Sequence, residues 1–232
     1  MALLSAGTVC AAGAKKPQPA DIEAARDRAA ALGSSTDPSA PAALSELLDY
    51  PNEVVRATAA TSLGQLGSSS ACAALLARLE KERIVFVRKE IVYAIGVTGD
   101  RSATAALVAR LPKEKDKEAR AAVATALGML ADPAAAPALT ERIGDKDPFV
   151  RREVIRALGV LRASGAVSGI VAALGSDGEA DVRRAAATAL GIIGDHNASA
   201  ALAKATRDPD PYVQQAALAA LAALNGARAG GA

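Results

Sequence analysis

This sequence contains few of the side chains on which metal sites and enzymes depend. Its 232 residues include two cysteines, one histidine and no tryptophan, and aromatic residues make up only 2% of the chain. Two cysteines cannot build a disulfide framework or a cysteine-based metal site, and a single histidine cannot supply the paired imidazoles that many metal and hydrolytic sites need. We therefore expect no metal, no cofactor and no catalytic residue.

An excess of charge of one sign is also lacking. The 27 Lys and Arg residues nearly balance the 25 Asp and Glu residues, which leaves a formal net charge of +2. This balance argues against nucleic acid or an anionic membrane as the partner. We expect no membrane span, and the sequence contains no G-x-x-x-x-G-K-[ST] phosphate loop.

Alanine, by contrast, is abundant, with 60 of the 232 residues, and apolar residues make up 51% of the chain. An interior built from small and aliphatic side chains favours helices that approach one another closely. No segment has the pattern of a strand.

A motif with a period of 31 or 32 residues occurs six times in the chain. Five copies have an arginine followed eight residues later by a glycine, and in the sixth copy Gln214 and Ala222 take these places. The arginines are Arg56, Arg88, Arg120, Arg151 and Arg183. The residues at −1, +3, +7 and +10 from this arginine are almost all apolar, which places them on one face of a helix. A fixed period of this length is typical of a solenoid built from stacked repeats.

The repeated glycines predict how neighbouring helices pack. The glycine at +8 is Gly64, Gly96, Gly128, Gly159 and Gly191 in the first five copies. Because glycine inside a helix costs about 1 kcal/mol relative to alanine, we expect it where a neighbouring helix leaves no room for a Cβ atom. A second glycine at +11, in Gly67, Gly99 and Gly194, fits a helix C-cap.

A second, shorter apolar pattern follows each glycine, so every unit reads as a helical hairpin. We expect the shorter helices to be capped at Ser70, Ser102, Asp132, Ser164 and Asn197. The turn before the next arginine-bearing helix carries Asp147-Pro148, Asp177-Gly178 or Asp208-Pro209.

The combination of D-x-x-x-x-x-R with a following A-x-x-A-L-G helix resembles the HEAT repeat, in the short HEAT-like form of the phycobilisome-lyase (PBS lyase) type. The resemblance covers residues 21–226. It implies an all-α, right-handed α-solenoid, an armadillo-like HEAT superhelix of about six helical hairpins, with residues 21–50 as an N-terminal cap and 51–226 as the repeats.

The same resemblance implies that an acidic residue six positions before each arginine links one unit to the next in a side-chain ladder. The residues that keep this spacing are Glu82 and Arg88, Glu114 and Arg120, Asp145 and Arg151, and Asp177 and Arg183. The two end copies depart from it, with Tyr50 before Arg56 and with Asp208 before Gln214. Capping repeats need no further neighbour, so these departures fit the two ends of an array.

The two ends of the chain read differently from the repeats. Residues 1–14 are apolar or small and end in Ala12-Gly13-Ala14, which has the form of a signal-peptidase site, although no Lys or Arg precedes the apolar run. The segment is either a signal peptide, which favours an exported or periplasmic protein, or a disordered tail. We expect residues 15–20 to be a linker and residues 227–232 to be a disordered tail.

The lone histidine and the cysteine of the repeat region are interpreted as structural residues. His196 stands alone before a predicted helix and reads as an exposed turn residue. Cys72 precedes an apolar run and lacks a nearby histidine, so we interpret it as a buried structural residue. HEAT-like deoxyhypusine hydroxylases need several His-Glu pairs, which this chain does not have.

The surface of the arginine-bearing helices is the candidate binding site. In HEAT-like stacks this helix lines the concave side, where positions +1 and +5 would face outward. The basic and aromatic residues at these positions are Lys89, Tyr93, Arg152, Arg156 and Arg184. Arg and Tyr are enriched in binding hot spots, although an ordinary solvated face remains the alternative.

Our leading hypothesis is a monomeric, non-catalytic scaffold that binds another protein, or an acidic peptide segment, through its concave face. Nucleic-acid binding on the same stripe is an alternative, against which the shortage of aromatic residues and the low net charge argue. An accessory lyase or maturation factor for a cofactor-bearing protein is a further alternative.

Overall fold

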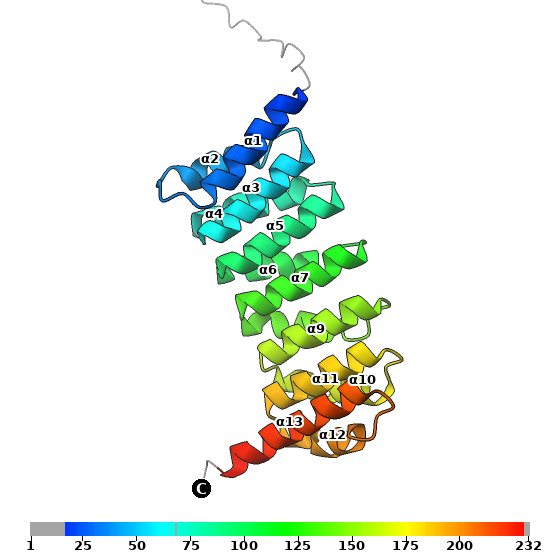
Figure 1. Ribbon diagram of the computed structural model, residues 1–232. Helices are drawn as coiled ribbons and strands as arrows, with labels where there is room; N and C mark the ends of the chain where they lie inside the picture. Colours follow the sequence, from blue (N-terminus) through cyan, green and yellow to red (C-terminus); the bar gives the residue numbers. More distant parts are fainter. Residues whose placement is uncertain (1–16, 68, 230–232) are drawn as a thin grey trace, which may run out of the picture.

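The computed structural model describes residues 17–67 and 69–229, and within these ranges the chain is helical and contains no strand. The helices are α1 (Pro19–Leu32), α2 (Ala40–Leu47), α3 (Glu53–Leu66), α4 (Ser69–Lys81), α5 (Val85–Thr98), α6 (Thr104–Arg110), α7 (Lys117–Leu130), α8 (Ala136–Thr140), α9 (Pro148–Val160), α10 (Val167–Ser176), α11 (Ala180–Ile193), α12 (Ser199–Ala205) and α13 (Pro211–Ala229). They form the expected α-solenoid, an elongated stack that the chain follows from one end to the other (Figure 1).

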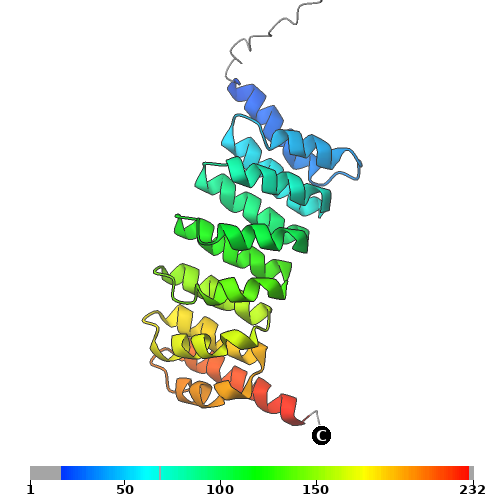
Figure 2. The same cartoon turned by 180° about the vertical axis from the view of Figure 1, so that it is seen from behind.

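The helices lie in two layers. The first contains α3, α5, α7, α9, α11 and α13, each packed against the next, and we call these the B helices. The second contains α2, α4, α6, α8, α10 and α12, which we call the A helices (Figures 1 and 2). Each A helix packs most closely against the B helix that follows it, while α1 covers α3.

This packing shows that the repeat unit begins with a different helix from the one predicted. The sequence pattern predicts hairpins that start with the arginine-bearing helix, whereas the structural hairpins are α2–α3 through α12–α13. The Asp-Pro and Asp-Gly turns therefore join the two helices within one hairpin. A periodic sequence fixes the length of the unit but leaves open which helix begins it.

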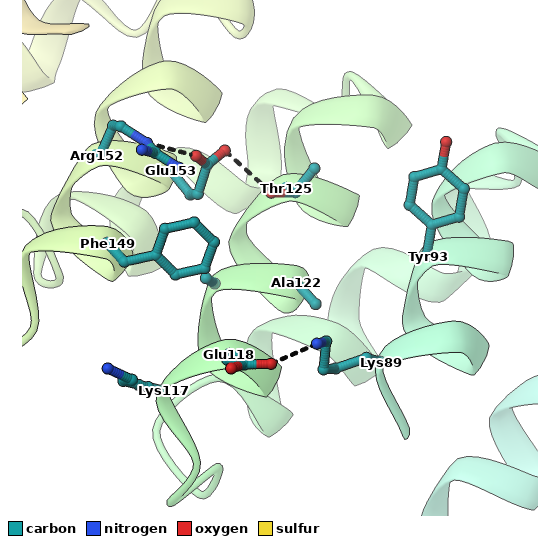
Figure 3. A pocket seen from close by; sticks show the side chains of 10 residues that line it. Lys89, Tyr93, Lys117, Glu118, Ala122, Thr125, Phe149, Arg152 and Glu153 are labelled. Carbon is teal, nitrogen blue, oxygen red and sulfur yellow. Dashed lines mark hydrogen bonds and ion pairs between the residues drawn. The ribbon is translucent and has the colours of Figure 1, made fainter. Parts of the chain in front are cut away.

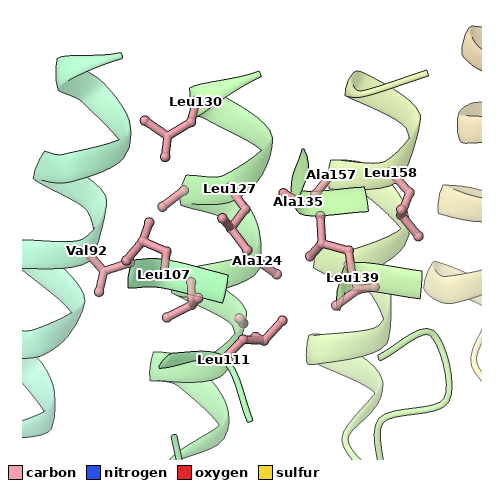
Figure 4. Packing of buried hydrophobic residues seen from close by; sticks show 14 of the residues in the cluster. Val92, Leu107, Leu111, Ala124, Leu127, Leu130, Ala135, Leu139, Ala157 and Leu158 are labelled. Atoms are coloured by element: carbon pink, nitrogen blue, oxygen red, sulfur yellow. The ribbon is translucent and has the colours of Figure 1, made fainter. Parts of the chain in front are cut away.

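An aliphatic core runs along the stack between the two layers. Figure 4 shows its central part, where Leu107 of α6 and Leu139 of α8 lie beside Leu127 of α7 and Leu158 of α9. All four leucines are fully buried. Since each repeat shares its core only with its neighbours, stability is expected to follow from nearest-neighbour contacts.

The glycine at +8 confirms the predicted close approach of the B helices. At each of the five glycines a Cβ atom would come within 3.1 Å of an alanine in the next B helix; the facing pairs are Gly64–Ala94, Gly96–Ala126, Gly128–Ala157, Gly159–Ala189 and Gly191–Ala220. In the N-terminal cap a Cβ atom at Gly33 would likewise lie 2.7 Å from the Ser62 hydroxyl. The C-cap glycines Gly67, Gly99 and Gly194 have positive φ, as predicted.

We predict that Gly159→Ala destabilises the protein while Gly175→Ala does not. Each glycine is the second-to-last residue of its helix, so both substitutions improve helix propensity. A Cβ atom at Gly159 would lie 2.9 Å from Ala189 Cβ, whereas at Gly175 it would meet nothing within 4 Å. Thermal unfolding should show that Gly159→Ala lowers the free energy of unfolding by about 1–3 kcal/mol and that Gly175→Ala raises it by about 0.5–1 kcal/mol. Equal effects of the two substitutions would contradict the close approach.

The helix caps differ in part from the prediction. Asp132 caps the turn before α8 as expected, with its carboxylate accepting the Ala134 N–H at 3.0 Å. The turns before α6 and α12 are capped by Asp100 and Asp195, two residues earlier than the predicted Ser102 and Asn197. The reason is that a 3₁₀ turn of three residues precedes each of these A helices.

Two further cap predictions have different outcomes. Ser164 begins the 3₁₀ turn before α10, which has no side-chain cap, so that prediction is wrong. Ser70 lies outside the residues whose side chains the structure describes.

The helical region extends slightly beyond the predicted limits of 21–226. It begins at Pro19, inside the predicted linker, and α13 continues to Ala229. The predicted disordered tail is therefore helical at 227–229, where alanine favours continuation of the helix. Residues 1–14, the predicted signal or tail, and residues 230–232 lie outside the described residues. None of the described helices has the length and the apolar character that a membrane span requires.

Candidate functional site

A ladder of ion pairs runs along the edge of the stack where the A and B helices of each hairpin join. The shortest N···O distances are 2.8 Å for Arg56–Glu82, 2.7 Å for Arg88–Glu114, 3.0 Å for Arg120–Asp145, 2.7 Å for Arg151–Asp177 and 2.8 Å for Arg183–Asp208. In each pair Nε and Nη2 of the arginine donate to the two oxygens of one carboxylate. This bidentate geometry is the strong form of an arginine–carboxylate pair.

Each ladder arginine also binds the loop of its own hairpin through Nη1. Arg120 donates to the carbonyls of Glu114 and Lys115, and Arg151 donates to the carbonyl of Asp145. An acidic residue such as Asp145 is thus held by its carboxylate from the preceding hairpin and by its carbonyl from the arginine six positions later. The sequence spacing of six reflects this backbone contact, while the ion pairs join residues 25 or 26 apart.

The ladder ends where the two departures occur in the sequence. Tyr50 offers only its carbonyl, which accepts a 3.0 Å hydrogen bond from Arg56. At the other end Asp208 binds Arg183, and Gln214 donates its side-chain N–H to the Asp208 carbonyl at 2.7 Å. The amide of Gln214 thus replaces the backbone contact of an arginine.

The ladder carboxylates are ionised despite their burial. Burial would raise the pKa of Glu82, but hydrogen bonds from Arg56, from the Ile84 N–H and from Arg78 outweigh it and lower this pKa to about 2. The pKa values of Glu114, Asp145 and Asp177 are also lowered, since their paired arginines outweigh the effect of burial. Carboxylates that stay ionised and paired with arginine are suited to holding the hairpins together rather than to transferring protons or binding a ligand.

Two adjoining pockets lie on the face formed by the B helices. The first, of about 490 Å³, lies between α5, α7 and α9, and its lining includes Lys89, Tyr93, Ala122, Thr125, Phe149 and Arg152 (Figure 3). The second, of about 620 Å³, lies between α9, α11 and α13, and its lining includes Arg152, Arg156, Asp181, Arg184 and Tyr212. All five predicted binding residues line one of the pockets, and Arg152 lines both.

The first pocket combines aromatic rings with a floor of small residues. Tyr93 and Phe149 stand on opposite sides of α7, with exposed fractions of 52% and 39%, and Ala122 lies between them (Figure 3). The guanidinium carbon of Arg152 lies 4.8 Å from the centre of the Phe149 ring. Such a pocket can accept an apolar side chain and hold it between two rings.

The basic residues of this face are paired with carboxylates of the same face. Lys89 binds Glu118, and Arg152 lies 2.8 Å from Glu153. In the second pocket Arg184 lies 2.9 Å from Asp181, while Arg156 approaches Glu153 only to 3.9 Å and is 65% exposed at its side chain. The face is therefore of mixed charge rather than basic.

Sequence reasoning missed part of this surface because position +1 lies at the border between the outward face and the side where the next B helix packs. Ala57 and Ala121, both at +1, are buried, since +1 lies seven residues before the +8 glycine, on the side where the next B helix packs. Long side chains at +1, such as Lys89 and Arg152, reach the pockets, and Ala121 contributes to the lining of the first one. The residue two before the arginine is the exposed one, and the aromatics Phe149 and Tyr212 at this position were a signal in the sequence.

The other singled-out residues, His196 and Cys72, lie outside the two pockets. His196 is exposed in a 3₁₀ turn, as predicted. Cys72 is buried, and burial together with the charge of Asp100 raises the pKa of its thiol. Among the described residues, no group of three or more His, Cys, Asp and Glu side chains could hold a metal ion.

Comparison with known proteins places the chain among repeat proteins. A family model described as HEAT repeats matches residues 18–93, 85–153 and 143–222. Among solved structures, the complex of CpcE and CpcF of phycocyanin lyase from Nostoc sp. PCC7120 has 27% identity and a TM-score of 0.61, covering 82% of this chain and 79% of that one. No curated protein sequence matches the chain.

Two designed structures show the same fold. An engineered protein has 21% identity and a TM-score of 0.60, covering 80% of this chain and 96% of its own. A designed armadillo repeat protein has 21% identity and a TM-score of 0.56, covering 80% of this chain and 99% of its own.

Proposed function

The chain belongs to the HEAT-repeat family, and on that basis we propose that it is a non-catalytic scaffold that binds a segment of another protein along the B-helix face. The observation that carries the proposal is the pair of adjoining pockets, because together they span five successive B helices, from α5 to α13. An extended peptide can lie across such a row, whereas a small molecule would occupy one pocket.

The chemistry of the two pockets defines the segment that fits them. The aromatic walls at Tyr93 and Phe149 suit an apolar side chain. The guanidinium group of Arg156, whose side chain is 65% exposed, suits a carboxylate of the partner, since arginine binds carboxylates in a planar, bidentate geometry. We therefore expect a partner with a large apolar residue near an acidic one.

Substitutions in the pockets should abolish capture of the partner. The 232-residue chain is used as bait in extracts of its native source, and captured proteins are quantified by mass spectrometry. We expect the double variant Tyr93→Asp with Phe149→Asp to reduce recovery of the specific partner at least tenfold, because both rings of the first pocket are lost. Arg156→Glu with Arg184→Glu should also reduce recovery, by reversing the charge of the second pocket.

The matched control is Val160→Asp. Val160 is 56% exposed, close to the 52% of Tyr93, and lies on α9 outside both pockets. Recovery of the partner by this variant should equal that of the parent. If the pocket variants retain the partner as well as Val160→Asp does, the binding surface lies elsewhere.

A second candidate function is that of an accessory lyase or maturation factor. The likeness to the phycocyanin lyase complex supports it. Its test is pigment that copurifies with the native protein, or transfer of a pigment to an acceptor protein in its presence.

Nucleic acid is a less favoured ligand, because the basic side chains of the B-helix face are paired with carboxylates. Binding of nucleic acid in a gel-shift assay at about 150 mM salt would contradict this conclusion.

A further inference from the structure

The last B helix, α13, exposes a surface that the other B helices bury. In α3, α5, α7, α9 and α11 the residue at +4 from the arginine is fully buried; these residues are Ala60, Val92, Ala124, Ile155 and Ala187. The equivalent residue in α13 is Leu218, which is 57% exposed. In the earlier repeats the next B helix covers this side, whereas none of the described helices covers it in α13.

The uncovered side of α13 is a regular stripe without charge. Gln215, Leu218, Ala222 and Asn225 are all exposed and follow one another at spacings of three and four residues, so they share one face. No charged residue occurs between Pro211 and Ala227. This spacing is the one with which helices pair along a seam.

The stripe is complementary to itself in the antiparallel direction. When two copies of α13 cross antiparallel about residue 220, the large Leu218 faces the small Ala222, and Gln215 faces Asn225. A large residue then packs against a small one, and two amides can exchange hydrogen bonds. A two-fold axis requires this reciprocity, because each residue pair occurs twice.

We propose that the outer face of α13 binds the α13 of a second copy of this chain, which makes a tail-to-tail dimer. The alternative of head-to-tail stacking would place this face on α1. The exposed surface of α1 carries five charged side chains, Asp21, Glu23, Arg26, Asp27 and Arg28, which packing against the uncharged stripe of α13 would remove from water. This proposal replaces the expectation of a monomer. It shares one residue with the pockets, because Gln215 also lines the second pocket.

Sedimentation velocity of the full chain over a range of concentrations tests the dimer. The parent should change from monomer to dimer mass as its concentration rises, and Leu218→Lys should remain monomeric over the same range. Because Leu218 is exposed, its substitution should leave the far-UV CD melt unchanged at concentrations where the parent is also monomeric. Val160→Lys, with nearly the same exposed fraction, should dimerise like the parent.

The pairing of Leu218 with Ala222 gives a second, more specific test. Ala222→Glu alone should also prevent dimerisation, whereas an equimolar mixture of Leu218→Lys and Ala222→Glu chains should form a heterodimer in which Lys and Glu face each other. A parent that stays monomeric at every concentration would overturn the proposal. So would a dimer that persists in Leu218→Lys, or a mixture that remains monomeric.

Discussion

Replacing Leu127 by aspartate is expected to lower the free energy of unfolding by more than about 4 kcal/mol. Leu127 is fully buried in α7, between the A and B layers. A carboxylate at this place would lose its hydration without gaining a partner, and the removed side chain would leave a cavity. Urea unfolding followed by circular dichroism measures the loss.

The control for this substitution is Val160→Asp, which also replaces an aliphatic side chain by a carboxylate, at a position that is 56% exposed. We expect its free energy of unfolding to lie within about 0.5 kcal/mol of the parent. Since each repeat contacts only its neighbours, the damage from Leu127→Asp should begin locally. Hydrogen exchange should therefore accelerate first in α6 to α9. Melting of the Leu127 variant at the parent temperature would contradict the assigned core.

Removal of a ladder arginine is expected to have the second largest effect. Arg120→Ala should lower the free energy of unfolding by about 3–5 kcal/mol, because the Asp145 carboxylate would stay buried with its charge unpaired. The carbonyls of Glu114 and Lys115 would also lose their hydrogen-bond donor. Thermal or urea unfolding of the full chain gives the value.

Arg156→Ala provides the comparison for this prediction. The Arg156 side chain is 65% exposed and approaches its nearest carboxylate, on Glu153, only to 3.9 Å. Exposed pairs of this kind contribute about 0–1 kcal/mol. A loss for Arg120→Ala as small as that for Arg156→Ala would mean that the ladder does not hold the hairpins together.

The fold could be predicted because its information is local and repeated. An arginine, an apolar stripe and a +8 glycine recur at nearly constant intervals, and the glycine alone predicts a helix contact without room for a Cβ atom. The contact at Gly159 and Ala189 follows directly from that reasoning. Because the same pattern occurs in six copies, its interpretation as a helix rests on six segments rather than on one.

The features that the sequence could not give depend on geometry between repeats. Glu82 precedes Arg88 by six residues, yet its carboxylate binds Arg56, and only the stacking of two hairpins brings these groups together. The outward face of the B helices was misplaced for the same reason, since the side covered by the next helix is set by the stacking angle. Phe149 was therefore missed in the first pocket although its position in the repeat was visible.

A double-mutant cycle on Arg120 and Asp145 is the most direct test of the claim that hairpins are joined to their neighbours by ladder pairs. The free energies of unfolding are measured for Arg120→Ala, Asp145→Ala, the double variant and the parent. The bidentate, buried pair predicts a coupling energy of about 1.5–3 kcal/mol, with the double variant less destabilised than the sum of the two single variants. Additivity within about 0.3 kcal/mol would show that the two side chains act independently, and would contradict the claim.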